Sequence, residues 1–130
     1  MKMSELIHEE LTGKIIEAFY EVYNNLGYGF LEKVYERSLM IELEEMGLEC
    51  ASQKPISVFY EGEVVGEYFA DIIVENKVII ELKAAESIRP EHKAQLTNYL
   101  RATDIEVGLV LNFGKKPEMS RRLFQNHLKR

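Results

Sequence analysis

The chain has 130 residues, of which 46% are hydrophobic and 29% charged, and its net charge is −6 at pH 7. These values fit one globular domain over residues 1–130 and exclude intrinsic disorder and collagen-like repeats. No apolar run approaches the ~18–20 residues of a membrane-spanning helix, and residues 1–10 lack the apolar core of a secretory signal. The single cysteine, Cys50, excludes an internal disulfide and a cysteine-based zinc site. We therefore expect a cytoplasmic protein without a membrane partner.

The charges are distributed unevenly along the chain. Residues 115–130 carry six basic groups and one acid, which leaves ten basic and twenty-one acidic groups in residues 1–114. The acidic body argues against binding of nucleic acid through a general positive potential. The basic C-terminal segment 115–130 fits an anionic partner, and it equally fits a solvated helix or a terminal strand.

Two helices are predicted in the first part of the chain. Apolar residues recur every three or four positions over residues 4–26, which is typical of one buried helix face. Gly27 and Gly29 follow, and either can adopt the positive φ that ends a helix. A second apolar stripe predicts a helix over residues 31–47, with Gly47 as its end signal.

The period of the apolar pattern changes to two from Pro55 onward, which predicts strands. Asn76 can adopt the left-handed conformation of a tight turn between two of them. The run at 78–84 is apolar on both faces, so we expect a central strand. Pro90 suits the first turn of a helix. The predicted elements are strands at 55–60, 64–74, 78–84 and 106–112 and a helix at 89–103. The tail from Lys115 is either a helix or an edge strand.

Two charged residues interrupt the predicted central strand. Strand alternation places Glu81 and Lys83 on one face and the apolar Leu82 on the other. Buried charges are costly unless they are paired or bound to a metal ion. One interpretation is an internal ion pair between Glu81 and Lys83. The other involves Asp71, which interrupts the preceding strand in the same way.

Asp71 faces Glu81 if the hairpin is antiparallel and centred on Asn76, because the numbers of opposed residues then sum to 152. The Cβ atoms of such neighbours lie ~4.5–5.5 Å apart, and like charges there destabilise a sheet. A hard divalent cation such as Mg²⁺ removes that penalty and keeps water ligands for a phosphate substrate. Lys83 would orient or help deprotonate one of those waters. A shift of one residue would make the two acids less direct neighbours. In the predicted register, the three residues suggest metal-assisted phosphodiester hydrolysis.

Asp71 and the Glu81-Leu82-Lys83 segment, separated by nine residues, resemble the signature of the PD-(D/E)XK nuclease superfamily. Ala70 stands where the name of the superfamily has proline, a position that varies among its members. The spacing alone is a weak signal, because Glu91-His92-Lys93 also has the acid-x-lysine form.

Three longer segments resemble the GxxExxY family, a small prokaryotic group within this superfamily. Residues 29–35 (GFLEKVY) resemble the motif that names the family. Residues 92–100 resemble its helix after the lysine strand, and residues 107–114 its last core strand. The resemblance covers about residues 10–124 in the expected order.

This resemblance implies an α/β fold of the restriction-endonuclease type, with an αβββαβ core and a mixed sheet flanked by helices. It implies that Lys83 is the catalytic lysine and that the cofactor is Mg²⁺ or Mn²⁺. The implied metal ligands are Asp71, Glu81, the backbone carbonyl of Leu82 and Glu32, an acid on the helix after the Gly29 turn.

The resemblance also implies that Gln95 and Tyr99 line the cleft, since they lie four residues apart on one helix face. His92 is a candidate for its rim. Arg121 and Arg122 are candidate phosphate contacts, and a solvated position explains them equally well. The implied substrate is nucleic acid, with DNA favoured over RNA.

Two other functions stay open at this point. One is a non-catalytic binding or regulatory module that keeps the sheet without turnover. The acidic body is compatible with it, whereas the intact Asp71, Glu81 and Lys83 argue against it. The other is a phosphodiesterase for small phosphate esters, since the sequence offers little basic surface for a polymer. A homodimer would join two basic tails into one groove, and we expect that form.

Overall fold

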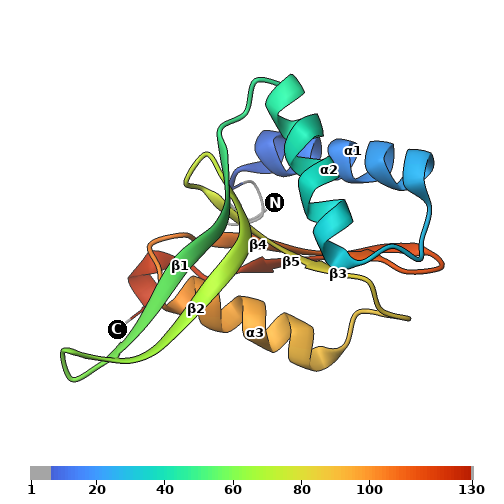
Figure 1. The fold of residues 1–130 in the computed structure, drawn as a ribbon. Coiled ribbons are helices and arrows are strands. Elements are labelled where there is room, and N and C mark those ends of the chain that lie inside the picture. Colours follow the sequence, from blue (N-terminus) through green and yellow to red (C-terminus); the bar gives the residue numbers. More distant parts are fainter. Residues whose placement is uncertain (1–6, 130) are drawn as a thin grey trace.

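A five-stranded mixed sheet forms the centre of the protein, and helices cover both of its faces (Figure 1). This computed structural model describes residues 7–129. In chain order, its elements are α1 (Glu9–Leu26), α2 (Glu32–Glu45), β1 (Cys50–Tyr60), β2 (Glu63–Val74), β3 (Val78–Lys83), α3 (Pro90–Arg101), β4 (Val107–Phe113), β5 (Pro117–Leu123) and a 3₁₀ turn at Asn126–Leu128. The predicted α/β fold, a mixed sheet flanked by helices, is confirmed. Within these residues, no helix is long and apolar enough to cross a membrane.

The strands lie side by side in the order β1-β2-β3-β4-β5. β3 and β4 are parallel, with α3 as the connection between them, whereas the other neighbouring pairs are antiparallel. In Figure 1, α1 and α2 lie on one side of the sheet and α3 lies on the other. β3 is the central strand, as predicted, and all of its residues except Lys83 are buried.

Each face of the sheet carries its own hydrophobic core. Under α1 and α2, the buried rings of Phe19 and Tyr35 both contact the ring of Phe113, with centroid distances of 4.9 and 4.1 Å. On the other face, α3 packs Leu96 against β4. Gly108 permits this close approach, because a Cβ atom there would lie 2.6 Å from Cδ1 of Leu96.

The structure corrects one predicted strand boundary, decides the form of the tail and sets where the first helix begins. The first strand begins at Cys50 rather than at Pro55. The prediction missed its first residues because residues 51–55 are exposed and carry no alternating apolar pattern. The tail forms the edge strand β5, one of the two predicted alternatives. The first helix begins at Glu9, and residues 4–6 of that prediction lie outside the described residues.

Candidate active site

The β2–β3 hairpin has the predicted register. The paired residues are Ile72 with Ile80, Ile73 with Ile79, and Val74 with Val78, so each pair of numbers sums to 152. Glu75 and Asn76 form the turn with left-handed φ values of 54°. In this register, Asp71 and Glu81 come one position beyond the Ile72–Ile80 pair, at the end away from the turn.

Asp71 and Glu81 interlock through the backbone of the opposite strand. The backbone N–H of Asp71 donates to Oε2 of Glu81 at 2.9 Å, and the N–H of Leu82 donates to Oδ2 of Asp71 at 2.8 Å. Each carboxylate therefore has one oxygen fixed by the neighbouring strand. These bonds hold the two acids together where β2 and β3 meet.

Burial makes the negative charge on this pair costly. Glu81 is only 4% exposed. Desolvation and then the charge of Asp71 raise the pKa of Glu81 to about 8. Desolvation also raises the pKa of Asp71, although the N–H of Leu82 opposes that shift. A proton or a cation therefore stabilises the pair.

Lys83 does not form the simple ion pair with Glu81 that was one interpretation of the sequence. Among residues 7–129, no ion pair within 4.0 Å joins them. The Lys83 amine instead donates to Oε1 of Gln95 on α3, at 3.5 Å. Lys83 is still near enough to lower the pKa of Glu81 through its charge. The amine therefore lies between the acids and α3.

α3 presents Gln95 and Tyr99 toward the acidic pair. Burial raises the pKa of the Tyr99 hydroxyl to about 12, and the charges of Glu81 and Asp71 add to the shift. Gln95 and Tyr99 line a hollow between α3 and the β1–β2 hairpin, and the acidic pair is not part of its lining, so their contact with substrate stays a prediction. His92 has a structural contact at the start of the helix, where its Nδ1 accepts a hydrogen bond from the N–H of Arg89 at 3.0 Å.

α2 contributes two acids that differ in burial. Glu32 is exposed in the first turn of the helix, and its charge makes a minor contribution to the raised pKa of Glu81. Glu36, one turn later, is 5% exposed. It accepts hydrogen bonds from the Lys33 amine at 2.8 Å and from Nε2 of Gln53 at 2.7 Å. The sequence analysis assigned no role to Glu36.

Gln53 links Glu36 to Asp71, and sequence reasoning missed it. Its Nε2 lies 3.4 Å from Oδ1 of Asp71. Gln53 occupies a break in the β1–β2 pairing, opposite Asp71, and has a left-handed φ of 52°. A glutamine in an exposed half-strand gives no sequence signal for this role. The helical spacing of Glu32 and Glu36 was the available signal for the second acid.

The loop before α2 is fixed by Tyr35. Its hydroxyl donates to the carbonyl of Gly27 at 2.7 Å and accepts from the N–H of Phe30 at 3.2 Å. Gly29 has a φ of 107°, which favours glycine. Residues 29–35 therefore form a braced turn that sets where α2 begins, and with it the position of Glu32.

The donor atoms of the acidic pair suit a hard divalent cation. Oδ1 of Asp71 and Oε1 of Glu81 accept no backbone hydrogen bond and can serve as ligands, and Mg²⁺ completes such a set with water. In the described part of the chain, no three acidic, histidine or cysteine side chains are grouped closely enough to hold a metal ion. The residues thus fit a cation held by two carboxylates, and the role of Glu32 as a further ligand stays a prediction.

Arg121 and Arg122 lie on β5, two strands away from β3. Nη2 of Arg121 donates to the carbonyl of Ile7 at 2.6 Å, so this guanidinium ties down the start of the described chain. Arg122 pairs with Gly108 and faces α3. Neither arginine is grouped with the acidic pair.

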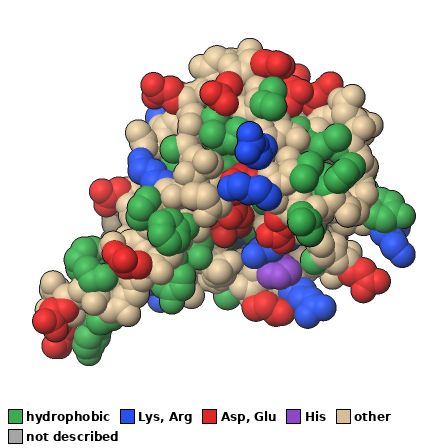
Figure 2. All heavy atoms as spheres, in the orientation of Figure 1, with side chains coloured by type: hydrophobic (Ala, Val, Ile, Leu, Met, Phe, Trp, Pro, Cys, Tyr) green, Lys and Arg blue, Asp and Glu red, His purple; other side chains and the backbone are tan. Residues whose placement is uncertain are grey.

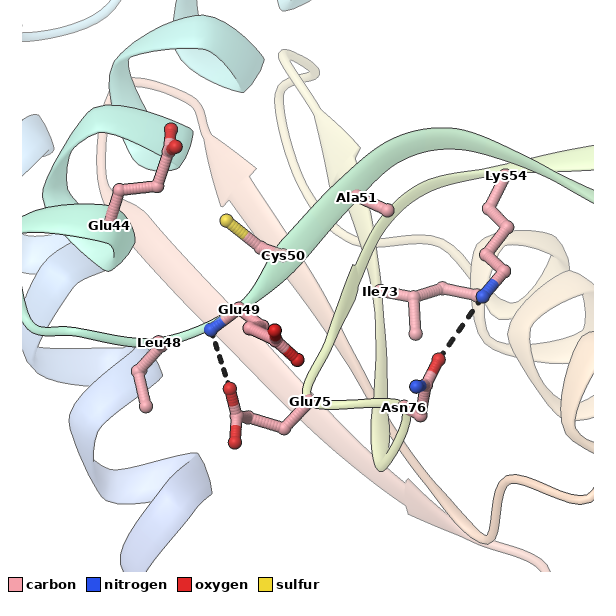
Figure 3. Close-up of a pocket in the computed structure, with 9 residues that line it drawn as sticks. All are labelled: Glu44, Leu48, Glu49, Cys50, Ala51, Lys54, Ile73, Glu75 and Asn76. Carbon is pink, nitrogen blue, oxygen red and sulfur yellow. Dashed lines mark hydrogen bonds between the residues drawn. The ribbon is translucent and has the colours of Figure 1, made fainter.

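Figure 2 shows acidic side chains gathered near the middle of one face of the molecule, flanked by basic ones. A separate hollow lies where α2 ends and β1 begins, and Figure 3 shows its lining residues. There the Lys54 amine donates to Oδ1 of Asn76 at 3.1 Å. Burial raises the pKa of the Cys50 thiol, which makes it a poor nucleophile. None of the predicted site residues lines this hollow.

A family model described as the PD-(D/E)XK nuclease superfamily matches residues 9–123. The chain belongs to the PD-(D/E)XK nuclease superfamily. The match spans the interlocked Asp71 and Glu81 and the nearby Lys83, and their catalytic roles stay predictions.

The fold is similar to that of a solved structure, the crystal structure of SSO0001. Its TM-score with this chain is 0.56 at 20% sequence identity, and the match covers 72% of this chain and 50% of SSO0001. This similarity concerns the fold alone, and the chain spans half the length of that relative. Among curated proteins, no significant match to the chain was found.

Proposed function

We propose that this PD-(D/E)XK protein is a nuclease that hydrolyses phosphodiester bonds in nucleic acid with Mg²⁺ or Mn²⁺. The observation that carries the proposal is the interlocked pair of Asp71 and Glu81, with Lys83 on the same face of β3. A buried and a half-buried carboxylate of raised pKa call for a compensating cation, and the adjacent lysine offers positive charge to a phosphate. The superfamily match supports the same reaction class.

In this proposal, the cation ligands are Asp71, Glu81 and the carbonyl of Leu82, and Glu32 joins them or holds a second ion. When bound, the cation supplies Lewis acidity and lowers the pKa of a bound water. Lys83 aligns the attacking water and offsets the negative charge that develops on the phosphate in the transition state.

The neighbours of these groups act as positioning residues. Gln95 holds the Lys83 amine, and Gln53 fixes Oδ1 of Asp71 relative to the buried Glu36. Tyr99 offers a neutral hydroxyl near the acidic pair, and burial raises its pKa to about 12, above the already high value of an ordinary tyrosine.

We further assign the chain to the GxxExxY group, because the braced turn at residues 29–35 gives its glycine and tyrosine clear roles. DNA is the favoured substrate over RNA. A homodimer and a cytoplasmic location belong to the same proposal.

A cleavage assay tests the proposal directly. End-labelled single-stranded DNA, duplex DNA and RNA would be incubated with Mg²⁺ or Mn²⁺ and with wild type, Glu81→Gln or Lys83→Met. We expect metal-dependent cleavage by wild type and a loss of at least ~100-fold in each variant, because transition-state stabilisation is removed. Glu67→Gln is the matched control, since Glu67 is an exposed acid on the same strand as Asp71.

Cleavage that persists in Glu81→Gln, or that ignores chelation of the metal, would contradict the assignment. If the protein hydrolyses a small phosphodiester such as bis-p-nitrophenyl phosphate but cleaves no nucleic acid, its substrates are small phosphate esters. Binding of nucleic acid with no hydrolysis under any metal would favour the non-catalytic module.

A further inference from the structure

A groove separates the outer flank of α3 from the edge strand β5. Its volume is about 430 Å³, and the polar residues that line it are Lys93, Thr97, Asn98 and Arg122. Pro90 and Ala94 complete the wall. The groove lies on the α3 face of the sheet, the same face that carries Glu81 and Lys83.

The groove is electropositive, although the chain as a whole has a net charge of −6. Its charged lining residues are Lys93 and Arg122, and no carboxylate lines it. The other described hollows each have at least one acid in their lining. A cationic groove in an acidic protein favours an anionic ligand.

Arg122 is not satisfied by the protein around it. Its Nε is buried and has no hydrogen-bond partner within the described residues. Among those residues, neither Arg122 nor Lys93 is in an ion pair. The neighbouring Arg121 differs, because its guanidinium donates to the carbonyl of Ile7. A guanidinium and an amine that line one groove, with no ion pair to either in the described residues, suit the charge of a phosphate.

The groove and the candidate active site lie on opposite flanks of one helical turn. Lys93 and Gln95 are two residues apart on α3, and Gln95 contacts Lys83. An α-helix with its side chains is about 10–12 Å across. A nucleic acid strand that passes the acidic pair can therefore continue around the start of α3 into the groove.

We propose that Lys93 and Arg122 form a binding site for the phosphodiester backbone, which holds the nucleic acid on the far side of α3 from the point of cleavage. The identity of this ligand rests on the proposed function. The site itself rests on the groove and the unpaired Arg122. It selects Arg122 rather than Arg121 as the phosphate contact, and it adds Lys93.

Binding measured without turnover tests this site. Fluorescence anisotropy of labelled DNA and RNA of matched sequence would be followed in EDTA over a series of KCl concentrations. The proteins are wild type, Lys93→Gln/Arg122→Gln and Lys77→Gln, in which Lys77 is an exposed lysine of the β2–β3 turn. We expect the double variant to bind more weakly and the slope of log affinity against log salt to fall by about two, one for each lost contact. Lys77→Gln should match wild type.

A wild-type slope in the double variant would overturn the site, provided that its circular dichroism spectrum and melting temperature match those of wild type. The DNA and RNA arms show which backbone fills the groove. If the protein binds nucleic acid through Lys93 and Arg122 but never cleaves it, this site stands and the proposed function fails. If the protein cleaves nucleic acid and its binding does not depend on these two residues, the proposed function stands and this site fails. If inorganic phosphate binds but neither labelled DNA nor labelled RNA does, the site is also overturned.

Discussion

The face of the sheet under α1 and α2 and the face under α3 bury different kinds of side chain. In the described residues, the first face holds about twice as many buried core residues as the second. On β3 the contrast occurs between neighbours, since Leu82 points into the larger core whereas Glu81 and Lys83 point toward α3. The larger core under α1 and α2 therefore contributes more to the stability of the fold. That stability offsets the desolvation cost of the polar groups on the face under α3.

Among the substitutions that compare the two faces of the sheet, Leu82→Ala should cause the largest decrease in the free energy of unfolding. Leu82 is 1% exposed, and truncation of such a leucine lowers the free energy of unfolding by ~2–5 kcal/mol. Urea denaturation followed by circular dichroism measures the change. Glu81→Gln is the adjacent comparison, and it should unfold at the same or a higher urea concentration, because it removes a desolvated charge. Equal destabilisation by both substitutions would contradict the division between the faces.

Tyr35→Phe should have a smaller effect. The substitution keeps the ring against Phe113 but removes the hydroxyl that bonds Gly27 and Phe30. We expect the free energy of unfolding to fall by about 1 kcal/mol. Amide hydrogen exchange should increase at Phe30 and in residues 27–31, with the protection of α1 unchanged. An unaltered exchange rate at Phe30 would show that the hydroxyl does not brace this turn.

The smallest expected effect is the contribution of Glu81, on the face under α3, to the pH dependence of stability. The pKa of Glu81 is raised in the folded protein from 4.5 to about 8, so the folded state holds this proton more tightly than the unfolded chain. In EDTA, the stability of wild type relative to Glu81→Gln should therefore fall as pH rises from 4.5 to 8, and level off above that. Melting temperatures of both proteins across this range measure the effect. Parallel curves would show that Glu81 carries no desolvation cost.

The sequence predicted the parts of the site that depend on local strand geometry. The alternation of β3 and the Asn76 turn set the register, and the register brings Asp71 to Glu81. Gln53 and Glu36 could not be predicted in this way. The left-handed backbone of Gln53 and the burial of Glu36 depend on contacts between β1, β2 and α2, which leave no periodic pattern in the chain.

The extent of β1 was missed for a related reason. Its first half is exposed, so burial imposes no alternation on its sequence. By contrast, β3 is buried on both faces, and its apolar run predicted its central position. Sequence reasoning was accurate where burial restricts residue choice, and it failed where a residue is placed by a distant partner.

A metal site at Asp71 and Glu81 can be tested by calorimetric titration of Mn²⁺ into the wild-type protein and into Asp71→Asn/Glu81→Gln. The double variant preserves the size of both side chains and removes their charge. We expect wild type to bind Mn²⁺ and the double variant not to bind it, although its circular dichroism spectrum shows that it is folded. Equal binding by both proteins, or no binding by wild type at millimolar Mn²⁺ with nucleic acid present, would contradict a metal site at Asp71 and Glu81.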